Sequence, residues 1–520
     1  MERRKFLKYT AASLAAPFLF RGQWINAMPA RSVIDVLSTY NTDRKLVLIQ
    51  LDGGNDGLNM VIPISQYDNL ANARRNILVN QSQILKLTDE TGLHPSMPEL
   101  TNLYMDGKVQ IIQGVGYPNS NLSHFRSKDI LISASDSNTI INSGWAGRMF
   151  GKQYPGYPTG FPNEKQTHPI ALTIGSTSSA TCQSEMANYS AVLKNLTSSY
   201  SNSSVSTDYP DTPHGKKLQF VTNMMEQTES YLSVIKTAAS KAKNLSSLYP
   251  SAGTNTLADQ LKIVANLIAG GLQTQIYVVS LGGWDTHSAQ VSSETDKLTG
   301  AQPTLFSKLS KAIAAFEDDL KLMNKADEVI GFVYTEFGRR IKSNDSLGTD
   351  HGTSWPAIVF GSKVNSGIIG KNPVIPAIVG KTDNLPVQND FRSIYTGLYK
   401  QWFNLDDQEI MQILGKTFPE IQVVTKSTGT SPMTAESAPN LKLWPNPVEN
   451  TAWLSFEAGG EISHIRIYSM SGQLIENHLR QKFSRGNQQI QLQLGHLATG
   501  TYQLVLQQNS QSRTVRFVVR

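Results

Sequence analysis

Short apolar runs rich in valine and isoleucine recur along most of the chain, separated by longer segments of mixed polarity. Nearly every position in these runs is apolar, which is typical of strands covered on both faces, as in a parallel sheet. The predicted strands are KLVLIQLDGG, KVQIIQGVG, HPIALTIG, QIYVVSLGG, EVIGFVYTEFG and PAIVFGSKV.

Four of the intervening segments carry apolar residues at helical spacing. They are PSMPELTNLYMDG, TPHGKKLQFVTNMMEQTESYLSVIKTAASKAKNL, NTLADQLKIVANLIAG and PTLFSKLSKAIAAFEDDLKLMN. Alternating strands and helices predict a three-layer α/β domain, a mixed or parallel sheet flanked by helices, within residues 30–425. Residues 176–206, dominated by serine, threonine and asparagine, are predicted to form a surface excursion outside the sheet.

The pattern changes after residues 426–440, a polar linker rich in serine, threonine and proline. Residues 441–520 alternate apolar and polar positions with a period of two, which predicts a small antiparallel β-sandwich. This module holds no cluster of acidic and imidazole groups, so we do not expect catalysis there. A carbohydrate-binding sandwich is the alternative, since Trp444 and Tyr502 offer rings that stack on sugars.

The amino-acid composition excludes several kinds of binding site. The net charge of the 520 residues is +6, but lysine and arginine are scattered, so we expect no nucleic-acid groove. The single cysteine, Cys182, excludes an intramolecular disulfide and a thiolate metal cluster. Any metal site must therefore use carboxylates and imidazoles.

The N-terminal stretch MERRKFLKYTAASLAAPFLF resembles a twin-arginine export signal. Its apolar run is too short and too interrupted for a membrane-spanning helix, so residues 1–29 are set apart from the fold and the chain is not expected to be transmembrane. The alternative is a basic N-terminal arm. The resemblance implies passage through the twin-arginine machinery, which carries folded chains and would allow a metal to be loaded before export.

Acidic and imidazole residues gather at the ends of the predicted strands, where ligands bind in open parallel sheets. The segments are VLIQLDGGNDG, VVSLGGWDTH, GFVYTEFGRR and GTDHGTSW. Taken singly, each residue has a structural explanation: Asp52 caps a turn, His287 is a core histidine, and Glu336 pairs with a neighbouring arginine. Crowded together they would repel or lose solvation unless a cation lies between them.

A divalent cation would relieve this repulsion, and oxygen and nitrogen ligands suit zinc, manganese, magnesium or calcium. The candidate ligands are Asp52, Asp285, His287, Glu336, Asp350 and His351. Neighbouring glycines are expected to let the backbone bend tightly enough to aim these side chains at one point.

A candidate nucleophile occurs in GVGYPNSNLSHFRSKDI. Ser123 stands at a predicted helix start, with His124 as a donor or base and Arg126 available for an anion. The alternative is an ordinary serine N-cap.

Several of these motifs together resemble the exported bacterial family known as domain of unknown function 1501. They are LIQLDGGNDGLNMVIPI, LHPSMPELTNLYMDGKVQIIQGVGYPNSNLSHF, SGWAGR, LGGWDTHSAQ, TEFGRRIKSNDSLGTDHGTSWPAIVFG and NDFRSIY. The family is similar in fold to the alkaline phosphatase and sulfatase superfamily, whose members use one or two metals to cleave phosphate or sulfate esters. The resemblance therefore implies that fold and that class of reaction.

Carried over residue by residue, the resemblance implies that Asp52 is a first-strand metal ligand. Asp285, His287 and His351 would complete one metal site, Glu336 would serve a second, and Ser123 matches the nucleophile. The superfamily's acid-histidine dyad is broken, because Phe337 stands in place of the histidine, and WDTH is more closely spaced than the usual pair. No cysteine or serine stands in the proline and arginine motif that marks formylglycine sulfatases, so we do not expect that activity.

The closing module resembles the C-terminal sorting domain of the type nine secretion system, through LKLWPNPVENTAWLSF, IRIYSMSGQLI, LATGTYQLVL and SRTVRFVVR. Tryptophan replaces a common tyrosine in this motif. The resemblance implies type nine export machinery as a partner and passage from the periplasm to the cell surface or the extracellular medium.

Together, the predicted metal site and these resemblances imply an exported metal-dependent hydrolase of phosphate or sulfate esters. Ser123 or a water would attack, and Arg126 or Arg339 would steady the anionic transition state. The alternative is a non-catalytic surface protein that binds glycan or protein partners.

Overall fold

The computed structural model describes residues 18–20, 23–25, 43–185, 187–196, 209–425, 441–460, 462–469, 474–508 and 511–520. Most of the predicted export signal lies outside the described residues. Its described part is a two-stranded antiparallel ribbon, β1 (Phe18–Phe20) and β2 (Gln23–Ile25). The predicted linker, residues 426–440, also lies outside the described residues.

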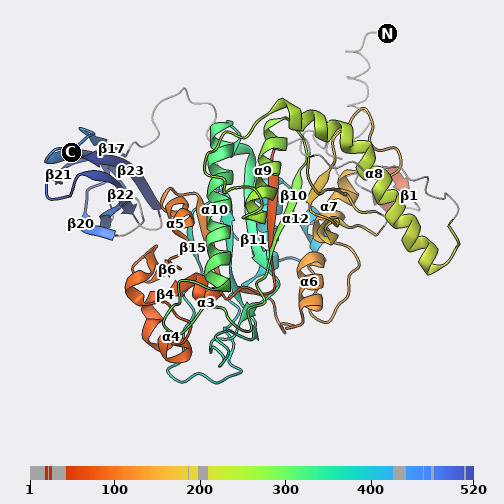
Figure 1. The fold of residues 1–520 in the computed structure, drawn as a ribbon. Helices are drawn as coiled ribbons and strands as arrows, with labels where there is room; N and C mark the ends of the chain where they lie inside the picture. Colours follow the sequence, from red (N-terminus) through yellow and green to blue (C-terminus); the bar gives the residue numbers. More distant parts are fainter. Residues whose placement is uncertain are drawn as a thin grey trace, which may run out of the picture.

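A nine-stranded sheet forms the centre of the large domain (Figure 1). Its strands include all six predicted ones and are β3 (Lys45–Asp52), β7 (Val109–Gly116), β8 (Ala171–Ile174), β9 (Ser190–Leu193), β10 (Ile276–Gly282), β11 (Val329–Thr335), β14 (Trp355–Phe360), β15 (Gly367–Ile369) and β16 (Asn389–Asp390). The order is β15-β7-β14-β11-β3-β10-β8-β9, with β16 beside β7. Only β14 pairs antiparallel, with β11 on one side and β7 on the other.

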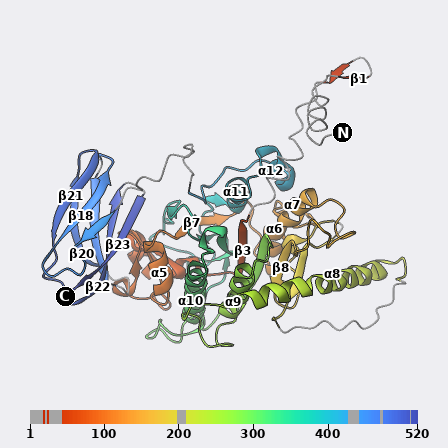
Figure 2. The ribbon, with the colours of Figure 1, turned by 90° about the horizontal axis from the view of Figure 1, so that it is seen from above.

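Helices cover both faces of this sheet (Figure 2). In β3, Val47, Ile49 and Leu51 face one layer, while Leu46 and Leu48 face the other. The first layer is α5 (Pro98–Met105), α8 (Pro213–Lys241), α9 (Thr256–Ala269) and α10 (Ala301–Leu322), which are the four predicted helices. The second layer is α6 (His124–Ser133), α7 (Trp145–Gln153), α11 (Phe391–Gly397) and α12 (Asp407–Leu414).

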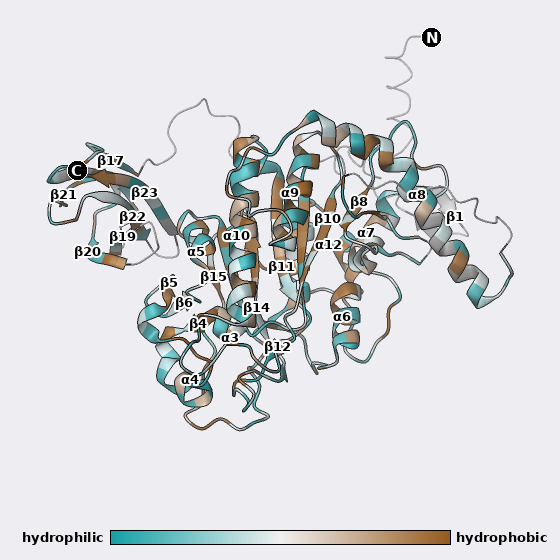
Figure 3. Ribbon diagram, viewed as in Figure 1, coloured by the Kyte–Doolittle hydropathy of each residue, from teal (hydrophilic) through white to brown (hydrophobic). Residues whose placement is uncertain are grey.

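Apolar residues on both faces of the strands explain why the runs are nearly continuous, and the predicted three-layer α/β fold is confirmed (Figure 3). Of the helices that the structure describes, none combines the length and the apolarity that a membrane span requires.

One prediction about the sheet is wrong. Residues 176–206 do not lie wholly outside it, because β9 pairs in parallel with β8 at the sheet edge. Ser190 of β9 is buried, and its hydroxyl lies 2.7 Å from the hydroxyl of Thr173 on β8. Ala191 and Leu193 are also buried, so β9 joins the sheet as a largely apolar strand whose one serine is hydrogen-bonded. Residues 197–206 lie outside the described part of the chain.

The C-terminal module consists of two antiparallel sheets, as predicted, with an apolar core of its own. Its strands are β17 (Lys442–Trp444), β18 (Thr451–Ala458), β19 (Ile462–Ser469), β20 (Leu474–Lys482), β21 (Gly486–Gln493), β22 (Gly500–Gln508) and β23 (Gln511–Val519). The module lies beside α5, where Tyr468 and Val505 join the core of the large domain and Arg466 forms an ion pair with Asp89.

The direction of β14 decides which loops meet. Parallel strands β3, β7, β10 and β11 end at one edge of the sheet, and antiparallel β14 begins there. Just before β14, a short ribbon joins β12 (Gly338–Arg339) to β13 (His351–Gly352). This edge carries the candidate site.

Candidate metal centre

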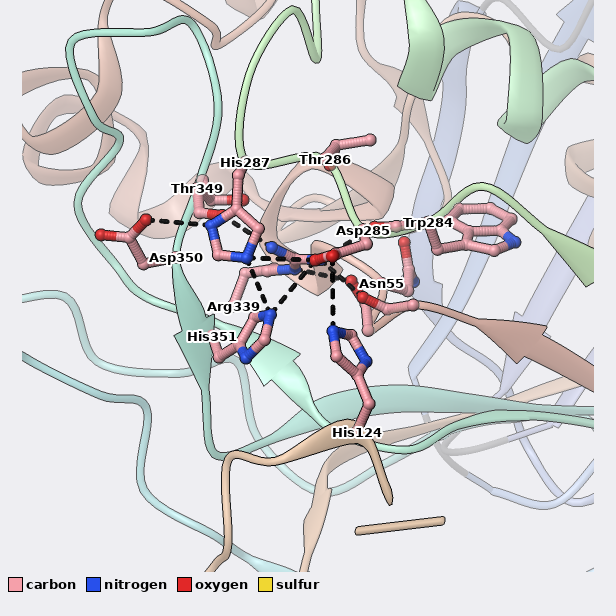
Figure 4. Close-up of polar contacts among 12 residues, drawn as sticks. Asn55, His124, Trp284, Asp285, Thr286, His287, Arg339, Thr349, Asp350 and His351 are labelled. Atoms are coloured by element: carbon pink, nitrogen blue, oxygen red, sulfur yellow. Dashed lines mark hydrogen bonds and ion pairs between the residues drawn. The ribbon is translucent and has the colours of Figure 1, made fainter. Parts of the chain in front are cut away.

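Three imidazoles surround the carboxylate of Asp285 (Figure 4). Oδ1 of Asp285 lies 3.1 Å from Nε2 of His287 and 3.1 Å from Nε2 of His351. Oδ2 lies 3.4 Å from Nε2 of His124. Asp285 and His287 follow β10, His351 belongs to β13, and His124 is the first residue of α6. Three separate segments of the chain thus bring these four side chains together.

The second nitrogen of each imidazole contacts an oxygen. Nδ1 of His124 lies 2.9 Å from Glu336, Nδ1 of His287 lies 3.2 Å from Asp350, and Nδ1 of His351 lies 2.8 Å from the carbonyl oxygen of Leu122. A carbonyl only accepts, so Nδ1 of His351 carries its proton, and the two carboxylates favour the same tautomer in the other rings. This pattern leaves the Nε2 lone pairs directed at the centre of the cluster.

Two of these lone-pair nitrogens, in His287 and His351, lie only 2.8 Å apart. Such a pair requires a shared positive charge, from a proton or from a metal ion. Ligand atoms of His124, Asp285 and His351 all lie within 4.8 Å of one another. Imidazole nitrogens backed by outer oxygen acceptors, together with one carboxylate, form a donor set that fits a divalent cation such as zinc.

Arg339 holds Asp285 ionised. Its guanidinium is buried and donates a 2.8 Å bond to Oδ1 of Asp285. Burial alone would raise the pKa of Asp285, but the hydrogen bonds of Arg339 and His351 and the charges of Arg339 and His287 hold the pKa at about 2. The carboxylate is therefore charged at neutral pH. Burial also lowers the pKa of His351, with the charges of Arg339 and His124 adding to the effect, which favours the neutral ring.

Two glycines let the loops approach one another. A Cβ on Gly53, whose φ is +128°, would lie 2.3 Å from the backbone nitrogen of Asp285. A Cβ on Gly348 would lie 2.2 Å from the carbonyl oxygen of His287. The sequence analysis expected these glycines to let the backbone bend. Gly348 serves a different purpose, because the absence of a side chain there lets two loops come into close contact.

Phe337 packs against the imidazoles. Its ring centroid lies 4.8 Å from that of His124 and 4.3 Å from that of His351. Phe337, which stands where the sequence resemblance led us to expect a histidine, therefore forms an apolar wall that supports two rings of the cluster.

A buried network behind the cluster joins its loops. The side-chain oxygen of Gln290 accepts bonds of 3.0 Å from the hydroxyls of Thr286 and Thr349, which neighbour Asp285 and Asp350. Its amide donates to Asp56 at 2.8 Å, and Asp56 forms a 2.8 Å ion pair with Arg74. Gln290 therefore fixes the spacing of the two loops that carry most of the cluster.

The structure brings five of the six predicted ligands into this region. Asp285, His287 and His351 contact one another directly, while Glu336 and Asp350 contact the outer nitrogens of the rings. Asp52 does not join them. Its carboxylate is bound instead by Lys128 and Gln50, both at 2.6 Å.

Four residues were predicted to act in catalysis: Ser123, His124, Arg126 and Arg339. His124 lies within the cluster, and Ser123 is exposed between His124 and Leu122, as the N-cap position of α6. Arg126 and Arg339 were predicted to contact an anion, and in the structure both donate hydrogen bonds within the chain. The guanidinium of Arg126 donates to carbonyl oxygens of residues 136, 137 and 139, and that of Arg339 is occupied by backbone carbonyls and Asp285.

Sequence reasoning missed Lys128 and Gln290. Lys128 stands four residues after His124 on a predicted helix, a spacing that places both on one helix face. Gln290 carries no comparable signal, since an isolated glutamine in a loop has no pattern that distinguishes it from a surface residue.

Comparison with known proteins identifies the large domain. The profile of a protein family of unknown function, DUF1501, matches residues 43–414. The chain belongs to the DUF1501 family. A secretion system C-terminal sorting domain follows at residues 442–520, so this DUF1501 chain carries an export tail. A search of curated proteins finds no match.

Solved structures similar to the DUF1501 chain come from the alkaline phosphatase superfamily and its sulfatases. A phosphonate monoester hydrolase from Silicibacter pomeroyi is 9% identical, with 91% of this chain and 89% of that chain covered and a TM-score of 0.32. An alkaline phosphatase superfamily protein from Vibrio parahaemolyticus is 10% identical (99% and 91% covered, TM-score 0.31). A sulfatase from Pseudoalteromonas sp. is 10% identical (91% and 89% covered, TM-score 0.33). With TM-scores below 0.5, these similarities do not decide the activity.

Proposed function

We propose that this chain is an exported, metal-dependent hydrolase of phosphate or sulfate esters. The observation that carries the proposal is the convergence of Nε2 of His124, His287 and His351 on the ionised carboxylate of Asp285. These four side chains would hold the cation. When bound, a divalent cation supplies a Lewis acid that stabilises negative charge developing on an ester oxygen.

The chain's own residues would orient the ligands and the substrate. Glu336, Asp350 and the carbonyl of Leu122 hold the three rings in the tautomer that directs Nε2 inward. Lys128, on the helix that begins with His124, is a cation that an incoming anionic group would reach, because its side chain is 34% exposed.

Ser123 is the proposed nucleophile, with water as the alternative attacker. Its neighbours on both sides are fixed to the cluster, since the carbonyl of Leu122 accepts from His351 and His124 contacts Asp285. The Ser123 hydroxyl makes no N-cap hydrogen bond in α6, so a structural cap does not account for it. A Ser123→Ala variant separates the two attackers, because only a serine mechanism would lose its activity.

The test is elemental analysis of purified full-length protein, followed by assays on phosphate and sulfate esters after EDTA treatment and metal reloading. We expect stoichiometric metal and hydrolysis that EDTA abolishes and reloading restores. His351→Ala should lose both, whereas His496→Ala, in the C-terminal module, should lose neither. Folded protein without metal and without activity would overturn the proposal and favour a non-catalytic surface protein that binds glycans or proteins.

The proposed route is export by the twin-arginine and type nine machineries to the cell surface or the medium. The sorting domain at residues 442–520 supports the second step. Cell fractionation with and without residues 442–520 tests it, since the truncated chain should stay in the periplasm.

A further inference from the structure

A cavity of about 610 Å³ opens at the same edge of the sheet as the histidine cluster. The cavity arises because strand β10 extends further than its neighbour β8 at this edge of the sheet. Pairing between β10 and β8 stops at Val278 and Thr173, while β10 continues to Gly282. The step leaves space between β10, the loop after β8 and the first turns of α9. Its volume is within the range of small-molecule sites.

One face of α6 connects the cluster to this cavity. His124, Lys128 and Ile132 are spaced four residues apart, so they lie on the same side of the helix. His124 contacts Asp285, Lys128 holds Asp52, and both Asp52 and Ile132 line the cavity. At 1.5 Å per residue, Lys128 is about 6 Å along the axis from His124, so one small ligand can reach both places.

The cavity wall is rich in hydroxyl and amide groups. Its polar lining includes Thr173, Ser176, Thr177, Ser280, Gln50 and Gln260. None of the described lining residues is aromatic. Of the two acidic residues in the described lining, Asp52 is paired with Lys128, and Asp259 accepts a hydrogen bond from the backbone N–H of Gly253. Such a wall suits a neutral ligand with many hydroxyl groups. It does not suit a polyanion, since Lys194 is the one basic residue among the described lining residues.

We propose that this cavity binds the polyhydroxylated alcohol part of the ester, as in a neutral sugar ring. Resting on the hydrolase function proposed above, this inference names the substrate class: sugar phosphates or sugar sulfates. The ester group would lie at the cluster beside Lys128, and the sugar hydroxyls would bond to the serine, threonine and glutamine side chains.

Binding is tested first without any reaction. The full chain is treated with EDTA and mixed with glucose, galactose and mannose, and saturation transfer to the sugar protons is measured by NMR. Ser280 is exposed on β10 and lines the cavity, so Ser280→Phe should fill it. Ser251→Phe, at an exposed loop residue outside the lining, is the matched control. We expect transfer in the wild type and the control and none in Ser280→Phe.

Absence of transfer in the wild type, or equal transfer in Ser280→Phe, would overturn the cavity proposal. Hydrolysis then separates the two proposals. In metal-loaded protein, Ser280→Phe should raise KM for a hexose phosphate about tenfold while leaving p-nitrophenyl phosphate nearly unaffected. Sugar binding without any ester hydrolysis would refute the hydrolase and retain the cavity. Hydrolysis of both esters unchanged by Ser280→Phe would refute the cavity and retain the hydrolase.

Discussion

Two charged clusters meet at one edge of the sheet and balance their charges differently. Asp56 and Arg74 are almost completely buried, and their 2.8 Å ion pair neutralises both within the chain. Asp285 is 46% exposed, and the imidazoles around it direct lone pairs toward it. Gln290 joins the two clusters. The Asp56–Arg74 pair behaves as part of the core. The cluster around Asp285 has Nε2 lone pairs that could bind a metal and is accessible to solvent, and a ligand site requires both.

The largest expected effect comes from breaking the Asp56–Arg74 pair. Asp56→Ala would leave Arg74 buried without a counter-charge, which costs about 3–5 kcal/mol of the free energy of unfolding. Urea denaturation measures this loss, and Asp68→Ala, at an exposed residue of α4 (Tyr67–Arg74), is the control. If the pair matters through its charges, adding Arg74→Met to Asp56→Ala should recover part of the stability. No recovery would mean that packing dominates.

A third acidic residue, Glu317, is buried and forms no ion pair with any residue that the structure describes. Burial of Glu317 in α10 raises its pKa from 4.5 to about 7, despite the charge of Lys108. The folded state therefore binds a proton more tightly than the unfolded state does, so stability is full below pH 4.5 and is lost as the pH rises to about 7. The loss reaches about 3 kcal/mol.

Glu317→Gln should remove this slope, while Glu294→Gln, at an exposed residue, should preserve it. Denaturation at pH 4.5 and pH 7.5 measures the difference. An equal slope in wild type and Glu317→Gln would contradict the raised pKa.

Removing a histidine from the cluster around Asp285 should weaken metal binding more than it lowers the stability of the fold. His351→Ala removes one proposed ligand, and its side chain is 20% exposed, so the metal-free protein should unfold near the wild-type temperature. Metal affinity and hydrolysis should fall by at least about 100-fold. Calorimetric titration with zinc and thermal unfolding without metal measure the two effects. A large drop in the unfolding temperature with unchanged metal affinity would assign His351 a structural role.

The smallest expected effect concerns the link between the clusters. Gln290→Leu keeps the side-chain size but removes the acceptor of Thr286 and Thr349, so the two loops should lose their fixed spacing. We expect about a tenfold weaker metal affinity, measured by competition with a chelator. Gln273→Leu, at an exposed site, should have no effect.

Much of the fold was predictable because its signals are local. Continuous apolar runs correctly located β3 and β11, since strands buried on both faces need apolar residues at every position. The strand β9 was missed because its four residues stand within a stretch dominated by serine, threonine and asparagine, and only pairing with β8 buries Ser190. The hydrogen bonds that Arg126 and Arg339 donate within the chain were not predictable, since a sequence does not show which backbone carbonyls lie near a guanidinium.

The sequence by itself determined which residues are candidate metal ligands, because Asp285, His287 and His351 stand beside the ends of predicted strands along the chain. Only the tertiary structure decided that they meet. Antiparallel β14 brings His351 to the edge where β10 ends, whereas a parallel strand would have placed it at the opposite edge. Only the structure likewise shows that Asp52 pairs with Lys128 and that Glu336 and Asp350 contact the outer ring nitrogens of His124 and His287. These contacts join residues far apart in the chain, so no local sequence pattern indicates them.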